Sequence, residues 1–168
     1  MALDELARRI SAPFKSQKTN ATVAEGRLGA SGPRLILAKP NTYMNLSGGP
    51  VAALLRFYKL LPANLIVLHD ELDIPFDTIK LKTGGGHGGH NGVRDIAAAS
   101  SSPDFVRVRI GIGRPPGRQP AADYVLKDFS GEERKTLPNL VSDAADAVEL
   151  VVGEGLTAAQ LRFHTAQP

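Results

Sequence analysis

The sequence has no cysteine among its 168 residues, which excludes disulfides, cysteine-ligated metals and cysteine nucleophiles. No apolar run approaches the roughly 18 residues that a transmembrane helix needs. The GxxxxGK[ST] pattern of nucleotide-binding P-loops and the HExxH pattern of zinc peptidases are also missing. These absences narrow the function to classes that use neither thiol chemistry nor the commonest phosphate and zinc motifs.

The overall composition is that of an ordinary folded protein, with 42% hydrophobic and 22% charged residues. A chain of this length is expected to form one domain, over residues 1–168, with a sizeable core. The net charge of +3 and the isoelectric point near 9.3 suit a polyanionic partner if the cations cluster. A basic but inert surface explains the total charge equally well.

Hydrophobic periodicity predicts strands that alternate with helices. Helices are expected over residues 2–10, from about Val51 to Tyr58 with Ser47 as N-cap, over 93–99, over 137–151, and after Thr157, where Thr157 and Gln160 form a capping box like that of Ser130 and Glu133. Strands are expected over residues 21–28, 34–38, 65–68, 80–82 and 106–113. This alternation predicts an α/β sandwich with a mostly parallel sheet.

A glycine-rich stretch spans residues 82–92, and six of its eleven residues are glycine. Flexible linkers are rich in glycine and serine but do not carry histidines at a fixed spacing, so a binding loop is the better interpretation. His87 and His90 would suit a metal only if further ligands converge on them. A histidine whose ring is satisfied by local backbone is the alternative, above all for His87.

An acidic stretch, His69 to Asp73, follows the predicted buried strand at 65–68. Ligand sites in open α/β sheets lie at the carboxyl ends of strands. A carboxylate there can orient an imidazole and make it a better general base. A solvated loop with a helix-capping aspartate is the competing interpretation.

Basic side chains recur on two predicted strands: Lys80 with Lys82, and Arg107 with Arg109, followed by Arg114 and Arg118 in a loop. If the two strands are neighbours, the four strand cations form one patch suited to phosphate oxygens. A solvated charged face explains the same pattern.

The polar stretch Lys39 to Gly49 places Tyr43, Met44 and Asn45 just before a predicted helix. A carboxamide near a helix N-terminus can donate to a developing oxyanion or hold a substrate amide. Met44 as core filler and Asn45 as a turn cap are the alternatives.

Four stretches together resemble the bacterial peptidyl-tRNA hydrolase family: KPNTYMNLSG at 39–48, HDELDIP at 69–75, GGGHGGHNG at 84–92 and RVRIGIGRP at 107–115. The resemblance implies a three-layer α/β sandwich with a mixed sheet wrapped by helices. It also implies a cytoplasmic monomer that cleaves the ester between a nascent peptide and tRNA, thereby recycling tRNA from abandoned translation. No membrane, metal or organic cofactor is implied.

The resemblance also implies roles for particular residues. Asp70 is similar to the carboxylate that holds the catalytic histidine in its basic form. Tyr43, Met44 and Asn45 are similar to residues of the substrate cleft, with Asn45 at the reacting group, and His90 and Asn91 are similar to its histidine and substrate-binding asparagine. Lys82 and Arg109 are similar to the cations that clamp the 5′ phosphate of tRNA.

The family pattern begins with a central strand, a GLGNPG-type turn and an RHN stretch that holds the general-base histidine, and none of these precedes Met1. His69, His87, His90 and His164 do not match that base. We therefore expect an N-terminally truncated hydrolase without its first central strand, in which Met1 is an internal methionine of a longer enzyme. A catalytically inactive RNA-binding relative and a non-functional fragment are the alternatives. Reading the genomic DNA upstream of Met1 for the GLGNPG and RHN codons tests this expectation.

Overall fold

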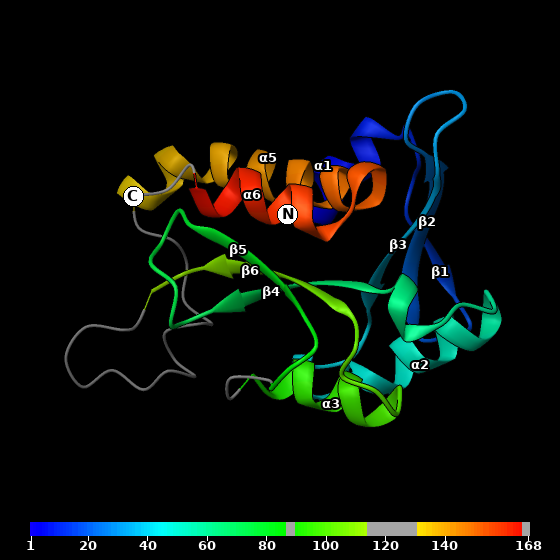
Figure 1. The fold of residues 1–168 in the computed structure, drawn as a ribbon. Helices are drawn as coiled ribbons and strands as arrows, with labels where there is room; N and C mark the ends of the chain where they lie inside the picture. Colours follow the sequence, from blue (N-terminus) through cyan, green and yellow to red (C-terminus); the bar gives the residue numbers. More distant parts are fainter. Residues whose placement is uncertain (87–89, 114–130, 166–168) are drawn as a thin grey trace. The chain divides into compact units, whose positions relative to one another are not determined.

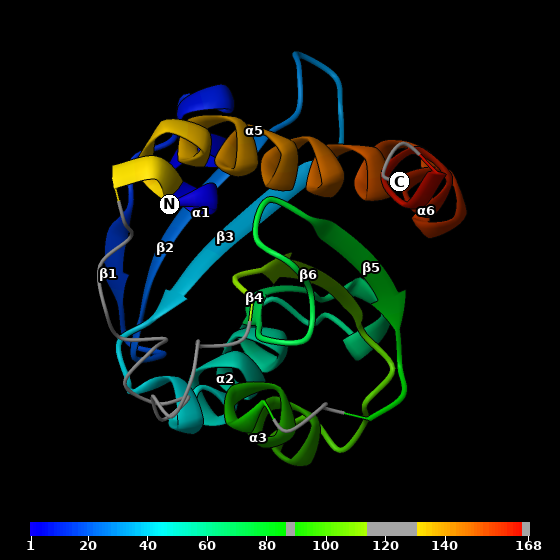
Figure 2. The same cartoon turned by 90° about the vertical axis from the view of Figure 1, so that its left-hand side faces the viewer.

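The computed structural model describes residues 1–86, 90–113 and 131–165 (Figures 1 and 2). The chain divides into two compact units. The first comprises Met1–Val67 and Thr83–Arg107, and the second comprises Leu68–Lys82 and Val108–Pro168. The single domain expected over residues 1–168 stays a prediction. His87, Arg114, Arg118 and Ser130 lie outside the described residues.

An antiparallel sheet and a short helix open the first unit. Helix α1 (Ala2–Arg9) is followed by β1 (Lys15–Gln17), β2 (Ala21–Arg27) and β3 (Arg34–Pro40). The strands are adjacent in the order β1-β2-β3, and both pairings are antiparallel. The connections between them are too short for the crossover of a dozen or more residues that parallel neighbours require.

Two helices and two 3₁₀ turns complete the first unit. They are η1 (Met44–Leu46), α2 (Gly48–Phe57), η2 (Pro62–Asn64) and α3 (Asn91–Ala99). Helices α2 and α3 pack together through a cluster of buried apolar side chains: Val51, Val93, Ile96 and Phe105. A second cluster joins Leu54 of α2 to Ala21 and Val23 of β2. These contacts hold the start of α2 beside α3.

The other sheet contains β4 (Ile66–Glu71), β5 (Ile79–Thr83) and β6 (Val106–Gly111) in the order β4-β6-β5. The N–H groups of Val106 and Ile112 donate to the carbonyls of Leu65 and Glu71, so β6 runs parallel to β4. The N–H groups of Gly84 and Gly111 donate to Phe105 and Thr78, so β6 runs antiparallel to β5.

The predicted α/β class with a mixed sheet is confirmed. The predicted predominance of parallel strands is wrong for the pairings that the structure describes, since β4 and β6 alone are parallel there. The error arose because helices and strands alternate in the sequence only in part. The stretch from β1 to β3 contains no crossover helix, so it forms a meander.

Two long helices dominate the second unit: α5 (Gly131–Glu154), which contains Pro138, and α6 (Leu156–Thr165). Their buried side chains are small or apolar: Leu140, Ala144, Ala145, Ala147, Val148, Ala159 and Phe163. The predicted capping box of Thr157 and Gln160 is wrong. Gly155 has a left-handed φ of +96° and its carbonyl accepts the N–H of Ala159, so α6 begins at Leu156, two residues earlier than a Thr157 cap allows.

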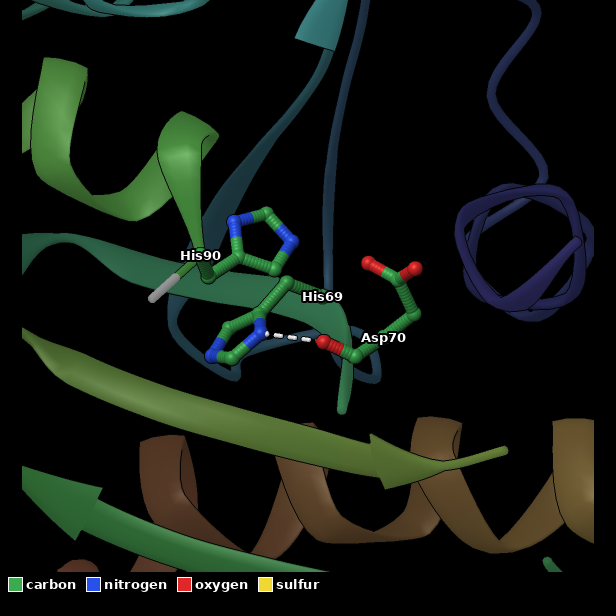
Figure 3. A group of neighbouring side chains, drawn as sticks. All are labelled: His69, Asp70 and His90. Carbon is green, nitrogen blue, oxygen red and sulfur yellow. Dashed lines mark hydrogen bonds between the residues drawn. The ribbon is translucent and has the colours of Figure 1, made fainter. Parts of the chain in front are cut away.

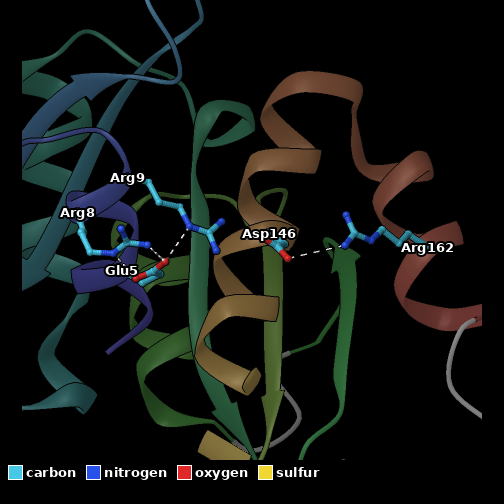
Figure 4. Close-up of polar contacts among 5 residues, drawn as sticks. All are labelled: Glu5, Arg8, Arg9, Asp146 and Arg162. Atoms are coloured by element: carbon cyan, nitrogen blue, oxygen red, sulfur yellow. Dashed lines mark hydrogen bonds and ion pairs between the residues drawn. The ribbon is translucent and has the colours of Figure 1, made fainter. Parts of the chain in front are cut away.

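Helices of both units carry ion pairs near the surface (Figure 4). Glu5 on α1 accepts from Arg8 at 2.6 Å and from Arg9 at 3.0 Å, and these hydrogen bonds lower the pKa of its carboxyl to about 2. In the second unit, Arg162 of α6 lies 3.7 Å from Asp146 of α5. Exposed pairs of this kind contribute little to stability. Among the described residues, no helix is long and apolar enough to cross a membrane.

Candidate substrate-binding and catalytic residues

The polar stretch after β3 forms an exposed turn before α2. Tyr43 is 83% exposed, and Asn45 is exposed within η1. Ser47 is the N-cap of α2 by position, as predicted, but its side chain makes no capping hydrogen bond. The carboxylate of Asp95 on α3 instead accepts the N–H of Gly48 at 2.7 Å.

Gly48 lies where α2 approaches the backbone of α3 closely. A Cβ at Gly48 would lie 2.3 Å from the backbone oxygen of Asp95, a distance that real Cβ atoms do not show. Helix α3 also packs directly against η1, which carries Asn45. The structure therefore brings η1 and α3 together, so Asn45 and the residues at the start of α3 belong to one surface of the first unit.

Helix α3 starts at Asn91, two residues before the predicted start, with His90 as its N-cap. The Nδ1 atom of His90 accepts the N–H of Val93 at 3.1 Å, so in this contact Nδ1 carries no proton. A neutral ring then keeps its proton on Nε2. The local backbone thus supplies a hydrogen-bond partner to one ring nitrogen of His90, as the alternative interpretation of the loop histidines expected. Asn91 is exposed.

Asp70 lies within β4, and its neighbour His69 is only 5% exposed. The Nδ1–H of His69 donates to the backbone carbonyl of Asp70 at 2.7 Å (Figure 3). The hydrogen bond goes to the backbone, so it does not occupy the Asp70 carboxylate. The competing interpretation of a solvated loop at His69 to Asp73 is wrong for the first three residues, because β4 continues to Glu71 through its pairing with β6.

Lys82 and Arg109 lie on neighbouring antiparallel strands of the second unit, and both are half-buried. The hydrogen bond between Gly111 and Thr78 sets a register in which Arg109 stands opposite Lys80. Because alternate residues share a face, Lys82 lies on that face too, diagonal to Arg109. The condition set for a basic patch, that the two strands are neighbours, is therefore met.

Arg107 is the exception within the predicted patch of four strand cations. It is 1% exposed, and its guanidinium donates to the carbonyls of Gly85, Gly86 and Pro103. The prediction that it joins an exposed basic patch is therefore wrong. The alternation of side chains along a strand places Arg107 on the same face as Arg109. It cannot show that backbone carbonyls accept the hydrogen bonds of the Arg107 guanidinium.

These features define an α/β protein that combines an exposed asparagine-bearing turn, a glycine-rich loop before a helix, and paired cations on adjacent strands. The peptidyl-tRNA hydrolase family model matches residues 1–168, and the chain belongs to this family. It is 70% identical to the peptidyl-tRNA hydrolase of Leifsonia xyli subsp. xyli, over 99% of this chain and 86% of that protein. It is 62% identical to that of Pseudarthrobacter chlorophenolicus, over 99% and 85%.

Solved structures agree with the sequence relatives. The crystal structure of peptidyl-tRNA hydrolase from Acinetobacter baumannii superposes with a TM-score of 0.87 at 34% identity. The match covers 96% of this chain and 82% of that one. The architecture of this chain is therefore that of the family.

Sequence reasoning missed two contacts that shape these surfaces. Asp95 has the pattern of an ordinary polar position on α3, and no local signal marks it as the acceptor for α2. Arg107 has the pattern of a phosphate-binding cation, and no local signal assigns it to the glycine loop. Both contacts join segments distant in sequence, which periodicity does not report.

Proposed function

We propose that this chain hydrolyses peptidyl-tRNA, the ester of a peptide with the terminal ribose of tRNA. Water attacks the ester carbonyl carbon, the bond to the ribose oxygen breaks, and that oxygen takes a proton. The products are a free peptide and a reusable tRNA. The observation that carries the proposal is the family match over residues 1–168. In this proposal the chain acts as a cytoplasmic monomer.

The proposed chemistry is general-base catalysis, with Asp70 orienting and stabilising the family's general-base histidine, for which residues 1–168 contain no motif match. This role is assigned to Asp70 by its place in the HDELDIP stretch, near the end of β4. Asn45 is proposed to bind the substrate near the reacting carbonyl, with Tyr43 and Met44 beside it. The exposed side chains of Tyr43, just before η1, and of Asn45, within η1, support this assignment.

His90 and Asn91 are proposed to bind the 3′ end of the substrate from the start of α3. The Nδ1 atom of His90 accepts the N–H of Val93, which fixes the ring at the start of α3. Lys82 and Arg109 are proposed to bind the 5′ phosphate of tRNA. Their common face and the half-buried setting of both side chains favour an anion over bulk solvent.

Turnover of N-acetylated aminoacyl-tRNA tests the proposal, measured by the release of deacylated tRNA. In an enzyme that carries the family's general-base histidine, Asp70→Asn should lower kcat by about 10²- to 10⁴-fold, because general-base catalysis contributes that much. Binding of deacylated tRNA should stay within about twofold, since the clamp is unchanged. A chain that binds tRNA but shows no turnover above the uncatalysed rate would overturn the hydrolase proposal in favour of an RNA-binding protein.

A further inference from the structure

The central residue of β5 is held by two side chains of α6, which lies beside that strand (Figure 1). Gln160 donates its side-chain amide to the carbonyl of Leu81 at 3.1 Å. His164, one helical turn later, accepts the N–H of Leu81 through Nε2 at 3.0 Å. Residues four apart lie on the same face of a helix, so the two side chains reach one residue of the strand together.

These contacts stand where a further strand of the sheet would pair. In the order β4-β6-β5, the described strands contact β5 on one side alone. The N–H of Gly111 in β6 donates to the carbonyl of Thr78. Because backbone groups alternate along a strand, those of Lys80 and Lys82 point toward β6 and those of Leu81 point away from it. Helix α6 thus supplies the donor and the acceptor that a neighbouring strand would supply at Leu81.

Lys82 is covalently next to this contact. The carbonyl of Leu81 and the N–H of Lys82 belong to one planar peptide group, so a hydrogen bond to the carbonyl also fixes the direction of that N–H. Lys82 is the last residue but one of β5, which ends at Thr83. Its side chain shares a face with Arg109, and diagonal neighbours of this kind lie about 7–8 Å apart. One phosphate can contact both cations only while the backbone beneath them stays in place.

We infer that Gln160 and His164 are positioning residues for the phosphate clamp, because they fix the backbone at Leu81 and Lys82 from the side of β5 that faces away from β6. The inference deepens the proposed function and rests on its assignment of Lys82 and Arg109 to the 5′ phosphate. A lysine side chain has a flexible four-carbon stem, so its ammonium stays near Arg109 only when the backbone holds the stem. Repulsion between the two cations opposes that arrangement until a phosphate binds.

The kinds of side chain favour positioning over general packing. Helix α6 packs on α5, and its buried side chains include Ala159 and Phe163. The side chain of Leu81 is buried as well. Apolar contacts of this kind hold segments together without fixing a direction. An amide donor and an imidazole acceptor add direction, because hydrogen bonds weaken steeply when they are bent.

The test measures how much the 5′ phosphate contributes to tRNA binding. The measured quantity is the Kd of deacylated tRNA with a 5′ hydroxyl, divided by the Kd of the same tRNA with a 5′ phosphate. Gln160→Met and His164→Leu each remove one bond to Leu81, whereas His164→Gln keeps an acceptor. Gln17→Met is the matched control, because the Gln17 amide donates to Tyr58 at 2.8 Å in the first unit. Measurement at pH 8 keeps His164 neutral, since burial lowers its pKa.

Gln160→Met and His164→Leu should each lower this ratio by about 3- to 10-fold, a part of what one charged hydrogen bond contributes. Both variants should bind the 5′-hydroxyl tRNA as the wild type does, because the clamp acts on the phosphate. His164→Gln and Gln17→Met should keep the wild-type ratio. Wild-type ratios in both Gln160→Met and His164→Leu would overturn the inference.

A double-mutant cycle shows whether the effect of Gln160 passes through Lys82. Lys82→Met should lower the ratio at least as much as Gln160→Met does. Adding Gln160→Met to Lys82→Met should then change the ratio no further, because the positioned ammonium is already absent. An equal loss from Gln160→Met with and without the Lys82 ammonium would also overturn the inference.

Loss of the fold and failure of the proposed function are kept apart from loss of position. Binding is measured below the unfolding midpoint of each variant. If Gln160→Met or His164→Leu does not fold, the other decides, because each removes one bond to Leu81. A ratio of one for the wild type removes the clamp, and the inference falls with it. A wild-type ratio above one that both variants retain leaves the clamp in place and overturns the inference alone.

Discussion

The imidazole of His164 accepts a hydrogen bond from the backbone N–H of Leu81 through Nε2, at 3.0 Å. Gln160, one turn earlier on α6, donates its side-chain amide to the carbonyl of Leu81 at 3.1 Å. Because Thr78 and Gly84 bond to β6, Leu81 directs its backbone groups to the other side of β5. Helix α6 thus hydrogen-bonds to the outer edge of β5, the strand that carries Lys82 of the proposed phosphate clamp.

The contact makes the stability of the second unit depend on pH. Burial lowers the pKa of His164, and the positive charges of Arg109 and Lys80 lower it further. The folded state therefore favours the neutral ring of His164. The stability that this contact contributes is complete above the pKa of His164 in the unfolded chain, near 6.5, and it is lost as the pH falls through the lower pKa of the folded state. We expect the midpoint temperature of thermal unfolding to decrease when the pH is lowered from 8 to 5.

His164→Gln isolates this effect from the other titrating groups. Glutamine keeps an acceptor for the Leu81 N–H but carries no proton in this range. The midpoint of His164→Gln should therefore change less over the same pH interval than that of the wild type. Equal pH dependence of the two proteins, followed by differential scanning calorimetry, would contradict the assigned contact. The size of the difference should be small, since the ring is partly exposed.

Two adjacent glycines at the start of α2 predict opposite outcomes. Gly48→Ala places a Cβ 2.3 Å from the backbone oxygen of Asp95, and overpacking of this kind costs about 1–3 kcal/mol. Gly49→Ala meets no atom within 4 Å and should be neutral or stabilising by up to about 1 kcal/mol, through helix propensity. Urea unfolding of the two variants measures both. Similar free energies of unfolding would show that α2 and α3 do not pack as described.

The sequence predicted the helices and strands whose apolar residues recur at a regular helical or strand spacing. Helix α1 was expected from the spacing of Leu3, Leu6, Ala7 and Ile10, of which Leu6 and Ala7 are buried. Strand β1 was missed, because Lys15–Gln17 is polar and its strand conformation comes from pairing with β2. Neither propensity nor periodicity reports such a pairing.

The candidate site shows the same limit. The family resemblance marked Asn45, Asp70 and Asn91, and it also paired Lys82 with Arg109. The supporting contacts were not predictable, because each joins a side chain to the backbone of a remote segment. Arg107 shows this most clearly: it has the same residue type and the same strand face as Arg109, yet it is buried on carbonyls.

The proposed clamp predicts a change in salt dependence. Arg109→Ala should weaken tRNA binding and reduce the slope of log K against log salt by about 0.7 to 0.9, the amount expected for one phosphate contact. Arg8→Ala is the charge-matched control, because that cation is already engaged with Glu5 on α1. Fluorescence anisotropy with labelled tRNA over a salt series measures both slopes. An unchanged slope for Arg109→Ala would remove Arg109 from the clamp.

Substitutions at Tyr58 and Tyr43 should affect different properties: the free energy of unfolding for Tyr58, and substrate binding for Tyr43. Tyr58 accepts the side-chain amide of Gln17 at 2.8 Å and donates to Glu25, and burial together with that carboxylate raises the pKa of its phenol. Tyr58→Phe leaves two polar partners without the hydroxyl, which should cost about 1–2 kcal/mol of unfolding free energy. Tyr43→Phe should leave stability unchanged, because that side chain is 83% exposed.

Substrate binding should show the reverse pattern. Tyr43 is proposed to lie in the substrate cleft, so Tyr43→Phe should raise KM for N-acetylated aminoacyl-tRNA by roughly 2- to 10-fold if its hydroxyl contacts the ligand, the range of one ordinary hydrogen bond. Tyr58→Phe should retain the wild-type KM at temperatures where it is folded, since its hydroxyl serves β1 and β2. A Tyr43→Phe protein with lowered stability and native KM would move Tyr43 from the cleft to the scaffold.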